Sequence, residues 1–186
     1  MENLRNYAII AIAICTIAMC STENAPAENK DYICRPADSL NTEHFIKQMS
    51  ASNAKELSLS KLAKKRSRNS KVREYATRVM DACILANSDL APFAILKNIK
   101  MPDSVTIDSD NSYTTLQQSG RADFDKEYLS MITDSHNQAI ALLTNMAMAR
   151  DTAISSFADK HLPVFRRHLD EGNYLSRHLH RKMKTS

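Results

Sequence analysis

Length, composition and charge together indicate a helical globular chain. The 186 residues are enough for one ordinary domain with an apolar core. Two glycines, no tryptophan and 6% aromatic residues leave little material for strands and tight turns. A net charge of +4 is too mild for a nucleic-acid-binding surface, which is usually strongly basic. We therefore expect an all-α protein without a nucleic-acid partner.

The N-terminus has the pattern of a targeting segment. Residues 7–19, YAIIAIAICTIAM, form an uncharged and largely apolar run. A membrane-spanning helix needs about 20 such residues, whereas this shorter run is typical of a signal peptide. The sequence IAMC at residues 17–20 is similar to a bacterial lipoprotein signal, which predicts lipidation at Cys20. The alternatives are cleavage after Ala27, at the end of the sequence APA, and an uncleaved anchor.

These interpretations all place the folded part in the cell envelope, either anchored to the membrane or in the periplasm. We expect a signal peptide at residues 1–20, a polar tether at residues 21–40 and a bundle domain at residues 41–182. Cys34 and Cys83 remain outside the signal. An oxidising compartment would allow a disulfide between them, but geometry decides whether it forms, so the sequence leaves this open.

Four amphipathic segments follow the tether in chain order. In each segment apolar residues recur every three or four positions, which is the helical pattern. The expected helices are residues 42–66, 70–97, 122–148 and a last one that begins near residue 151 and continues past residue 175. Pro92 and Pro163 lie inside the second and fourth of these and should bend them.

The connection between the second and third helices is unusually long. Residues 98–121 are polar and poorly periodic, with a short extra turn expected at residues 113–118. A helix of about 25 residues is about 38 Å long, and a linker of this length can span that distance. The pattern predicts a four-helix bundle and permits the ferritin-like crossover, while an up-down-up-down order stays an alternative.

Each apolar stripe contains one polar side chain near its middle. At about 1.5 Å per residue, these groups lie roughly 18–27 Å from the nearest helix turn, so they would meet halfway along the bundle. They are Glu56, Cys83, His136 and His168, with His161 as a possible fifth member.

Two interpretations of this polar set compete, and a third alternative is that the groups never meet. An oxygen, a thiolate and two imidazoles suit zinc or copper better than a di-iron centre, which needs several carboxylates and the Glu-x-x-His motif that this chain lacks. In the other interpretation, Glu56 pairs with His136 or His168 and fixes the helix register, while Cys83 packs as a small apolar residue.

A basic segment, KLAKKRSRNSKVR, spans the first helix turn at residues 61–73 and contains no acidic residue. Positive charge near a helix C-terminus is stabilised by the helix dipole, so an ordinary solvated turn is one interpretation. A contact with an anionic lipid or polysaccharide is the other. The residues concerned are Lys61, Lys64, Lys65, Arg66, Arg68, Lys71 and Arg73.

Four stretches carry a resemblance to a known family. They are NAKELSLSKLA (53–63), VREYATRVMDACILAN (72–87), SGRADFDKEYLSMITDSHNQAIAL (119–142) and FADKHLPVFRRHL (157–169). Their order and spacing resemble the ferritin-like bacterial family called domain of unknown function 4142. The resemblance implies a ferritin-like bundle in the envelope and supplies no reaction.

The family's conserved pattern is only partly present. The resemblance aligns its helix-one Glu with Glu56 and two of its histidines with His136 and His168. Its helix-two Asp-His pair falls on Ala82 and Cys83, and its helix-three Asp falls on Ser135. If the family site holds metal, this chain has lost or altered ligands.

Motifs for catalysis are missing from the sequence. It contains no Gly-rich phosphate loop, no Gly-x-Ser-x-Gly and no His-Glu-x-x-His. We therefore expect an envelope-tethered, non-enzymatic bundle with a structural, stress-related or binding role. The alternatives are a metal-binding or redox protein that uses the mid-bundle set, and a binder of anionic envelope polymers through the basic turn.

Overall fold

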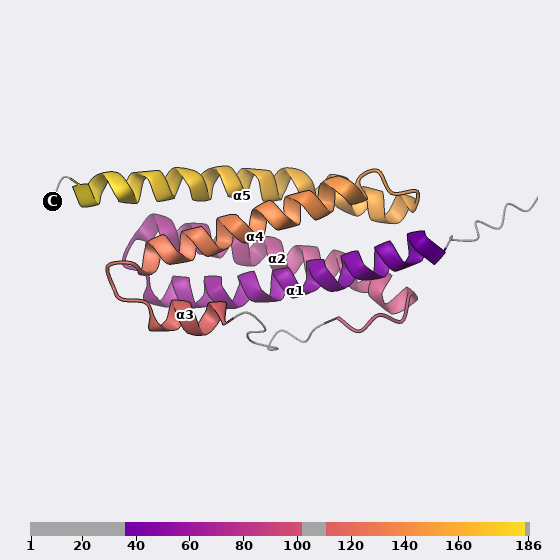
Figure 1. Cartoon of the computed structure of the whole chain (residues 1–186), viewed down its shortest axis with the longest axis horizontal. Coiled ribbons are helices and arrows are strands. Elements are labelled where there is room, and N and C mark those ends of the chain that lie inside the picture. Colours follow the sequence, from indigo (N-terminus) through magenta and orange to yellow (C-terminus); the bar gives the residue numbers. More distant parts are fainter. Residues whose placement is uncertain (1–35, 102–110, 185–186) are drawn as a thin grey trace, which may run out of the picture. The chain divides into compact units, whose positions relative to one another are not determined.

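The computed structural model describes residues 36–101 and 111–184, and the described secondary structure is entirely helical. The predicted signal peptide, Cys20 and Cys34 lie outside these residues. The helices belong to one compact unit, Cys34–Ser186. They are α1 Pro36–Arg66, α2 Ser70–Leu96, α3 Ser112–Gln118, α4 Phe124–Met146 and α5 Thr152–Lys184 (Figure 1).

Polar caps set two of the helix starts. The side chain of Asn69 accepts a hydrogen bond of 3.0 Å from the amide of Lys71 at the start of α2. Asp151 accepts one of 3.1 Å from the amide of Ala153 at the start of α5. Asn98, with a φ of 52°, follows the end of α2 in the left-handed conformation that asparagine tolerates.

The predicted helices are all confirmed, with shifts at their ends. The short turn expected at residues 113–118 is α3, at Ser112–Gln118. The helix expected from residue 42 begins instead at Pro36, so residues 36–40 of the expected tether are helical. Proline is favourable in a first helical turn because the amide it lacks would have no partner there.

The order of the helices is the ferritin-like crossover. Helices α2 and α4 run in the same direction, so α4 begins at the opposite end of the bundle from the end of α2 (Figure 1). Helix α1 packs against α2 and α4, and α5 packs against the same two helices. Every neighbouring pair of long helices is therefore antiparallel, and the all-α four-helix bundle with a long connection between its second and third long helices is confirmed.

The core has two apolar clusters with a polar layer between them. One cluster surrounds Tyr75 and Tyr128, towards the α1–α2 turn. The other surrounds Phe45, Leu90 and Phe157, towards the start of α1. Side chains of α1, α2, α4 and α5 form the polar layer.

Helix α2 is long and apolar enough to cross a membrane by length and composition alone. Packing of α2 within the bundle also accounts for this apolar composition. One face, which includes Val72, Val79, Ala86 and Leu90, is buried between α1 and α5. Pro92 lies in its last turns.

Candidate functional site: a buried polar layer and a basic end

The centre of the polar layer is the carboxyl group of Glu56 on α1, which is fully buried. The hydroxyl of Ser135 on α4 donates to Glu56 Oε1 at 2.6 Å. The thiol of Cys83 on α2 donates to Glu56 Oε2 at 3.4 Å. Three helices are thus joined through one side chain, because both carboxyl oxygens have partners on different neighbours.

His136 on α4 lies against the same carboxyl group. Its Nδ1 is 3.5 Å from Glu56 Oε2 and 3.0 Å from the carbonyl oxygen of Ile132, one helical turn earlier. A carbonyl only accepts hydrogen bonds, so this contact places a proton on Nδ1. The expected pairing of Glu56 with His136 agrees with this geometry.

His168 on α5 completes the layer but does not reach Glu56 by any described hydrogen bond. Its ring centre is 5.7 Å from that of His136, and its Nδ1 is buried without a hydrogen-bond partner in the described part of the chain. Burial, with a smaller contribution from His136, lowers the pKa of His168 to about 4. The folded protein therefore holds this imidazole neutral near pH 7.

Tyr75 on α2 fixes the backbone beside His168. Its hydroxyl donates to the carbonyl oxygen of His168 at 3.0 Å. Gly172 permits this approach, because a Cβ there would lie only 2.8 Å from the Tyr75 hydroxyl. Burial raises the pKa of Tyr75 well above its ordinary value, so this group stays a neutral donor.

The geometry gives no support to the predicted metal set of Glu56, Cys83, His136 and His168. Three of them converge, with His168 alongside. Within residues 36–101 and 111–184, however, no three His, Cys, Asp or Glu side chains could jointly hold a metal ion. Cys83 is also a poor ligand as it stands: it is a buried free thiol whose pKa is raised by burial, whereas metals bind the thiolate.

His161, the fifth predicted member, belongs to a different contact. Its Nε2 is 2.7 Å from Asp89 Oδ2, and Lys160 Nζ is 2.6 Å from the same oxygen. Its ring also packs on Phe157, with the centres 4.5 Å apart. His161 thus ties α5 to α2 away from Glu56, and its ligand role is not supported.

Sequence periodicity missed several partners in the polar layer because they are neither apolar nor metal ligands. Ser135 bonds Glu56 and is 3.0 Å from the hydroxyl of Ser52. Ser60 and Tyr128 form a second buried pair, with their hydroxyl oxygens 2.9 Å apart. Two signals were available for Ser135: its position beside His136, next to the buried stripe of α4, and the family resemblance, which aligns a helix-three Asp with it.

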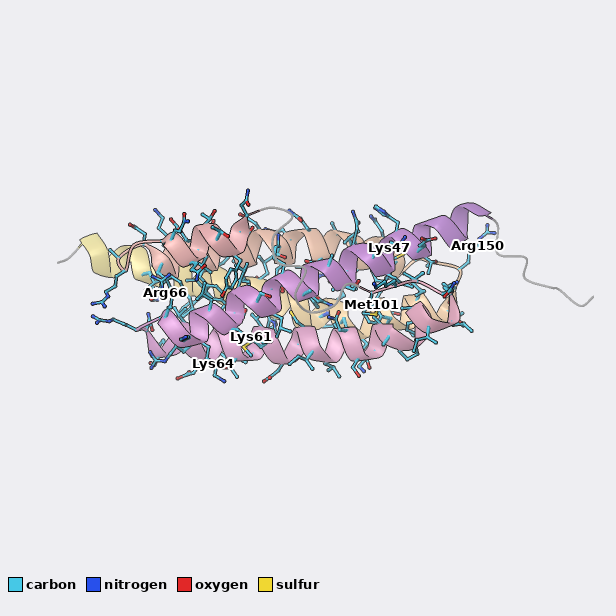
Figure 2. The ribbon with its side chains drawn as sticks, turned by 90° about the horizontal axis from the view of Figure 1, so that it is seen from below. Lys47, Lys61, Lys64, Arg66, Met101 and Arg150 are labelled. Carbon is cyan, nitrogen blue, oxygen red and sulfur yellow. The ribbon has the colours of Figure 1, made fainter. Side chains whose placement is uncertain are left out.

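The basic segment lies at the end of the bundle where α1 ends and α2 begins. Figure 2 shows Lys61, Lys64 and Arg66 towards this end, whereas Lys47 and Arg150 lie towards the other. Two of the predicted anion contacts serve the fold instead: Arg73 donates to the carbonyl oxygen of Ser67, and Arg66 donates to carbonyl oxygens of the α3 segment. The side chains of the other five are exposed: Lys61, Lys64, Lys65, Arg68 and Lys71.

Comparison with known families gives a clear match. Residues 32–175 match the domain of unknown function DUF4142. The chain belongs to this family. The match covers all four long helices for most of their length, so the resemblance inferred from the four sequence stretches is confirmed.

Comparison with solved structures supports the fold. The crystal structure of a DUF305 fragment from Deinococcus radiodurans is similar over 77% of this chain and 97% of that chain, with a TM-score of 0.64. The two sequences are 13% identical, so this likeness concerns the fold alone. Comparison with the curated proteins found no match.

Proposed function

We propose that this DUF4142 protein is a non-enzymatic bundle, tethered in the cell envelope, that binds anionic envelope polymers through the basic end of α1 and α2. The observation that carries the proposal is the separation of two features along the bundle. The chain enters the helices at Pro36, and the basic segment lies where α1 ends, at Arg66. At about 1.5 Å per residue, α1 separates them by about 46 Å.

This separation suits a tethered binder. The predicted lipid anchor at Cys20 would join the bundle at the start of α1 and leave the opposite end, with its exposed lysines, to contact soluble polymers. Exposed lysines are mobile point charges, which suit a repetitive anionic chain better than one small ligand of fixed shape. The electrostatic attraction between these lysines and an anionic polymer would act over about 10 Å at moderate salt.

The polar layer supports a structural role for the interior. The oxygens of Glu56 already have partners on α2 and α4, and Cys83 and His136 are almost completely buried. Such a network specifies which helices pair and in which register. The proposed binding therefore uses the surface, and the interior keeps that surface in place.

The test is retention of the full chain, purified in detergent, on immobilised long-chain polyphosphate, with uncharged dextran as the blank. The basic-end variant carries Lys64→Gln, Lys65→Gln and Lys71→Gln. Its matched control carries Lys47→Gln, Lys100→Gln and Arg150→Gln, which remove the same charge from exposed positions outside the basic segment. Far-UV circular dichroism checks that both variants keep their helices.

We expect the wild type and the control to be retained and released at similar salt concentrations, and the basic-end variant to elute at much lower salt. Equal loss of retention in both triple variants would contradict the proposal, because it would show a response to net charge alone. Failure of the wild type to bind would also contradict it. Retention on anionic lipid vesicles but not on the polymer would assign the basic end to a membrane instead.

A further inference from the structure

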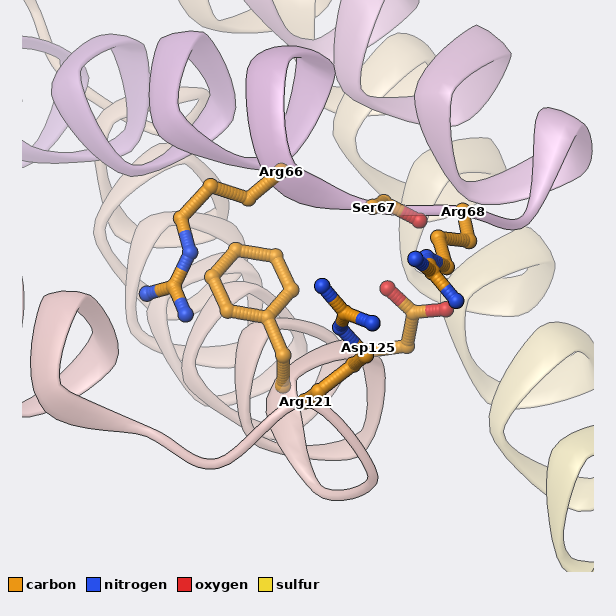
Figure 3. A pocket seen from close by; sticks show the side chains of 6 residues that line it. Arg66, Ser67, Arg68, Arg121 and Asp125 are labelled. Carbon is orange, nitrogen blue, oxygen red and sulfur yellow. The ribbon is translucent and has the colours of Figure 1, made fainter.

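A pocket of about 250 Å³ opens beside the basic segment. Two parts of the chain that are far apart in sequence form it: the end of α1 with the turn that follows, and the turn that leads into α4. Figure 3 shows Arg68, Arg121 and Asp125 directed towards one another across this pocket. The lining residues are Arg66, Ser67, Arg68, Arg121, Phe124 and Asp125.

The three arginines of the pocket differ in how they are held. Arg66 is fixed, because its guanidinium donates to the carbonyl oxygens of Leu116, Gln117 and Ser119 and stacks 4.6 Å from the ring centre of Phe124. Arg68 and Arg121 are exposed and have no hydrogen bond or ion pair within the described residues. Their donors are therefore available to a ligand.

The charge of the pocket selects an anion. Three guanidinium groups and one carboxyl group, that of Asp125, line the pocket, so positive charge is in excess even when Asp125 is ionised. Two guanidinium groups that meet across a pocket match the oxygens of a tetrahedral oxyanion, which arginine binds through paired hydrogen bonds. The volume is below the range of about 300–1,000 Å³ typical for larger organic ligands, which favours a small group.

From this geometry we propose that Arg68 and Arg121 bind a phosphate group, either as inorganic phosphate or as the terminal phosphate of an anionic polymer. Asp125 should make the site prefer phosphate to other tetrahedral oxyanions such as sulfate. A carboxylate repels an anion but accepts a hydrogen bond from a P–OH group, which inorganic phosphate carries near neutral pH and sulfate does not. The pocket thus favours phosphate over sulfate. The polymer form of this ligand rests on the function proposed above, whereas the inorganic form does not.

The first experiment is calorimetric titration of the full chain with inorganic phosphate at low salt and neutral pH. Arg121→Gln removes a guanidinium that lines the pocket. Lys71→Gln removes the same charge from the basic segment but outside the pocket, and it serves as the matched control. We expect the dissociation constant for phosphate to rise about tenfold or more in Arg121→Gln, the scale of a lost charge-assisted contact, and to change less than about twofold in Lys71→Gln.

The second experiment tests the role of Asp125. Wild type should bind sulfate more weakly than phosphate, and Asp125→Asn should strengthen sulfate binding and reduce this difference. Thermal unfolding of each variant, followed by circular dichroism, checks that the α4 start remains folded. Arg68→Lys and Arg121→Lys keep the charge but lose the forked donors, so both should weaken phosphate binding even where the net charge is unchanged.

Three results would contradict the proposed phosphate site. They are no saturable heat with millimolar phosphate, equal weakening of phosphate binding by Arg121→Gln and Lys71→Gln, and equal affinity for sulfate and phosphate in the wild type. These failures differ from failure of polymer binding. Retention on polyphosphate that survives Arg121→Gln but is lost in the triple lysine variant would reject the pocket as a polymer site and leave the proposed function standing. Phosphate binding without retention on polyphosphate would support the pocket and contradict the proposed polymer-binding function.

Discussion

Ser135 on α4 donates a hydrogen bond of 2.6 Å to Glu56 on α1, at a point where both side chains are almost completely buried. The resemblance to the family aligned a helix-three Asp with this serine. A second carboxylate so close to Glu56 would need a proton or a cation between them. Serine supplies a neutral hydrogen-bond donor instead, so side chains of the polar layer can satisfy Glu56 without a cation.

The first prediction concerns this contact. Ser135→Ala leaves a buried Glu56 oxygen with one donor fewer, and we expect a loss of about 1–3 kcal/mol in the free energy of unfolding. Ser130→Ala, at an exposed position of the same helix, should change it by less than about 0.5 kcal/mol. Urea denaturation at pH 7 measures both. Equal values for the two variants would show that the contact does not stabilise the fold.

The second prediction follows from the low pKa of His168, about 4 in the folded protein against an ordinary value of 6.5. Between these values the unfolded chain binds a proton that the folded chain does not, so stability should fall as the pH decreases from 6.5 to 4. His168→Gln should make this fall shallower. His178→Gln, at an exposed position of α5, should leave it unchanged. Urea midpoints measured across this pH range give the dependence of stability on pH. The same dependence in His168→Gln and in the wild type would contradict the prediction.

The third prediction concerns the reactivity of Cys83. Burial raises the pKa of its thiol and excludes solvent, so iodoacetamide should label it in the folded protein far more slowly than in urea. Mass spectrometry of the peptide that contains Cys83 separates it from the other cysteines. Labelling of Cys83 in the native protein at the rate seen in urea would contradict the buried, hydrogen-bonded position described above.

The fourth prediction concerns the attachment of α3. Arg66→Gln removes the guanidinium that holds three carbonyl oxygens of that segment, so its amides should exchange with solvent about tenfold faster or more. The four long helices should stay protected. Lys65→Gln, an exposed neighbour, is the control. Unchanged exchange across Ser112–Gln118 in Arg66→Gln would show that the buried Leu116 alone is sufficient to hold α3.

Sequence patterns predicted the fold well because apolar periodicity reports which face of each helix is buried. That signal located all four long helices, whereas the length of the connection permitted the crossover without excluding an up-down-up-down order. It was weakest at the start of α1, where polar residues continue the helix back to Pro36. A helix can extend beyond its buried stripe, and no apolar pattern marks that extension.

The candidate sites were predicted less completely because they depend on tertiary contacts. Position along the helices placed Glu56 beside Cys83 and His136, as found, but it also placed His161 near the same layer, whereas that side chain pairs with Asp89. Axial height does not specify which neighbour a side chain meets. Likewise, the basic run did not reveal that Arg66 holds α3, or that Arg121 joins Arg68 from a distant turn.

The most direct measurement of the central claim is lysine footprinting of the wild-type protein. Acetylation of the full chain, with and without long-chain polyphosphate, would be quantified for each lysine by mass spectrometry. We predict that the polymer protects Lys61, Lys64, Lys65 and Lys71 and leaves Lys47 and Lys100 as reactive as in its absence. Equal protection of both groups, or protection of neither, would contradict an anion-binding surface at the basic end.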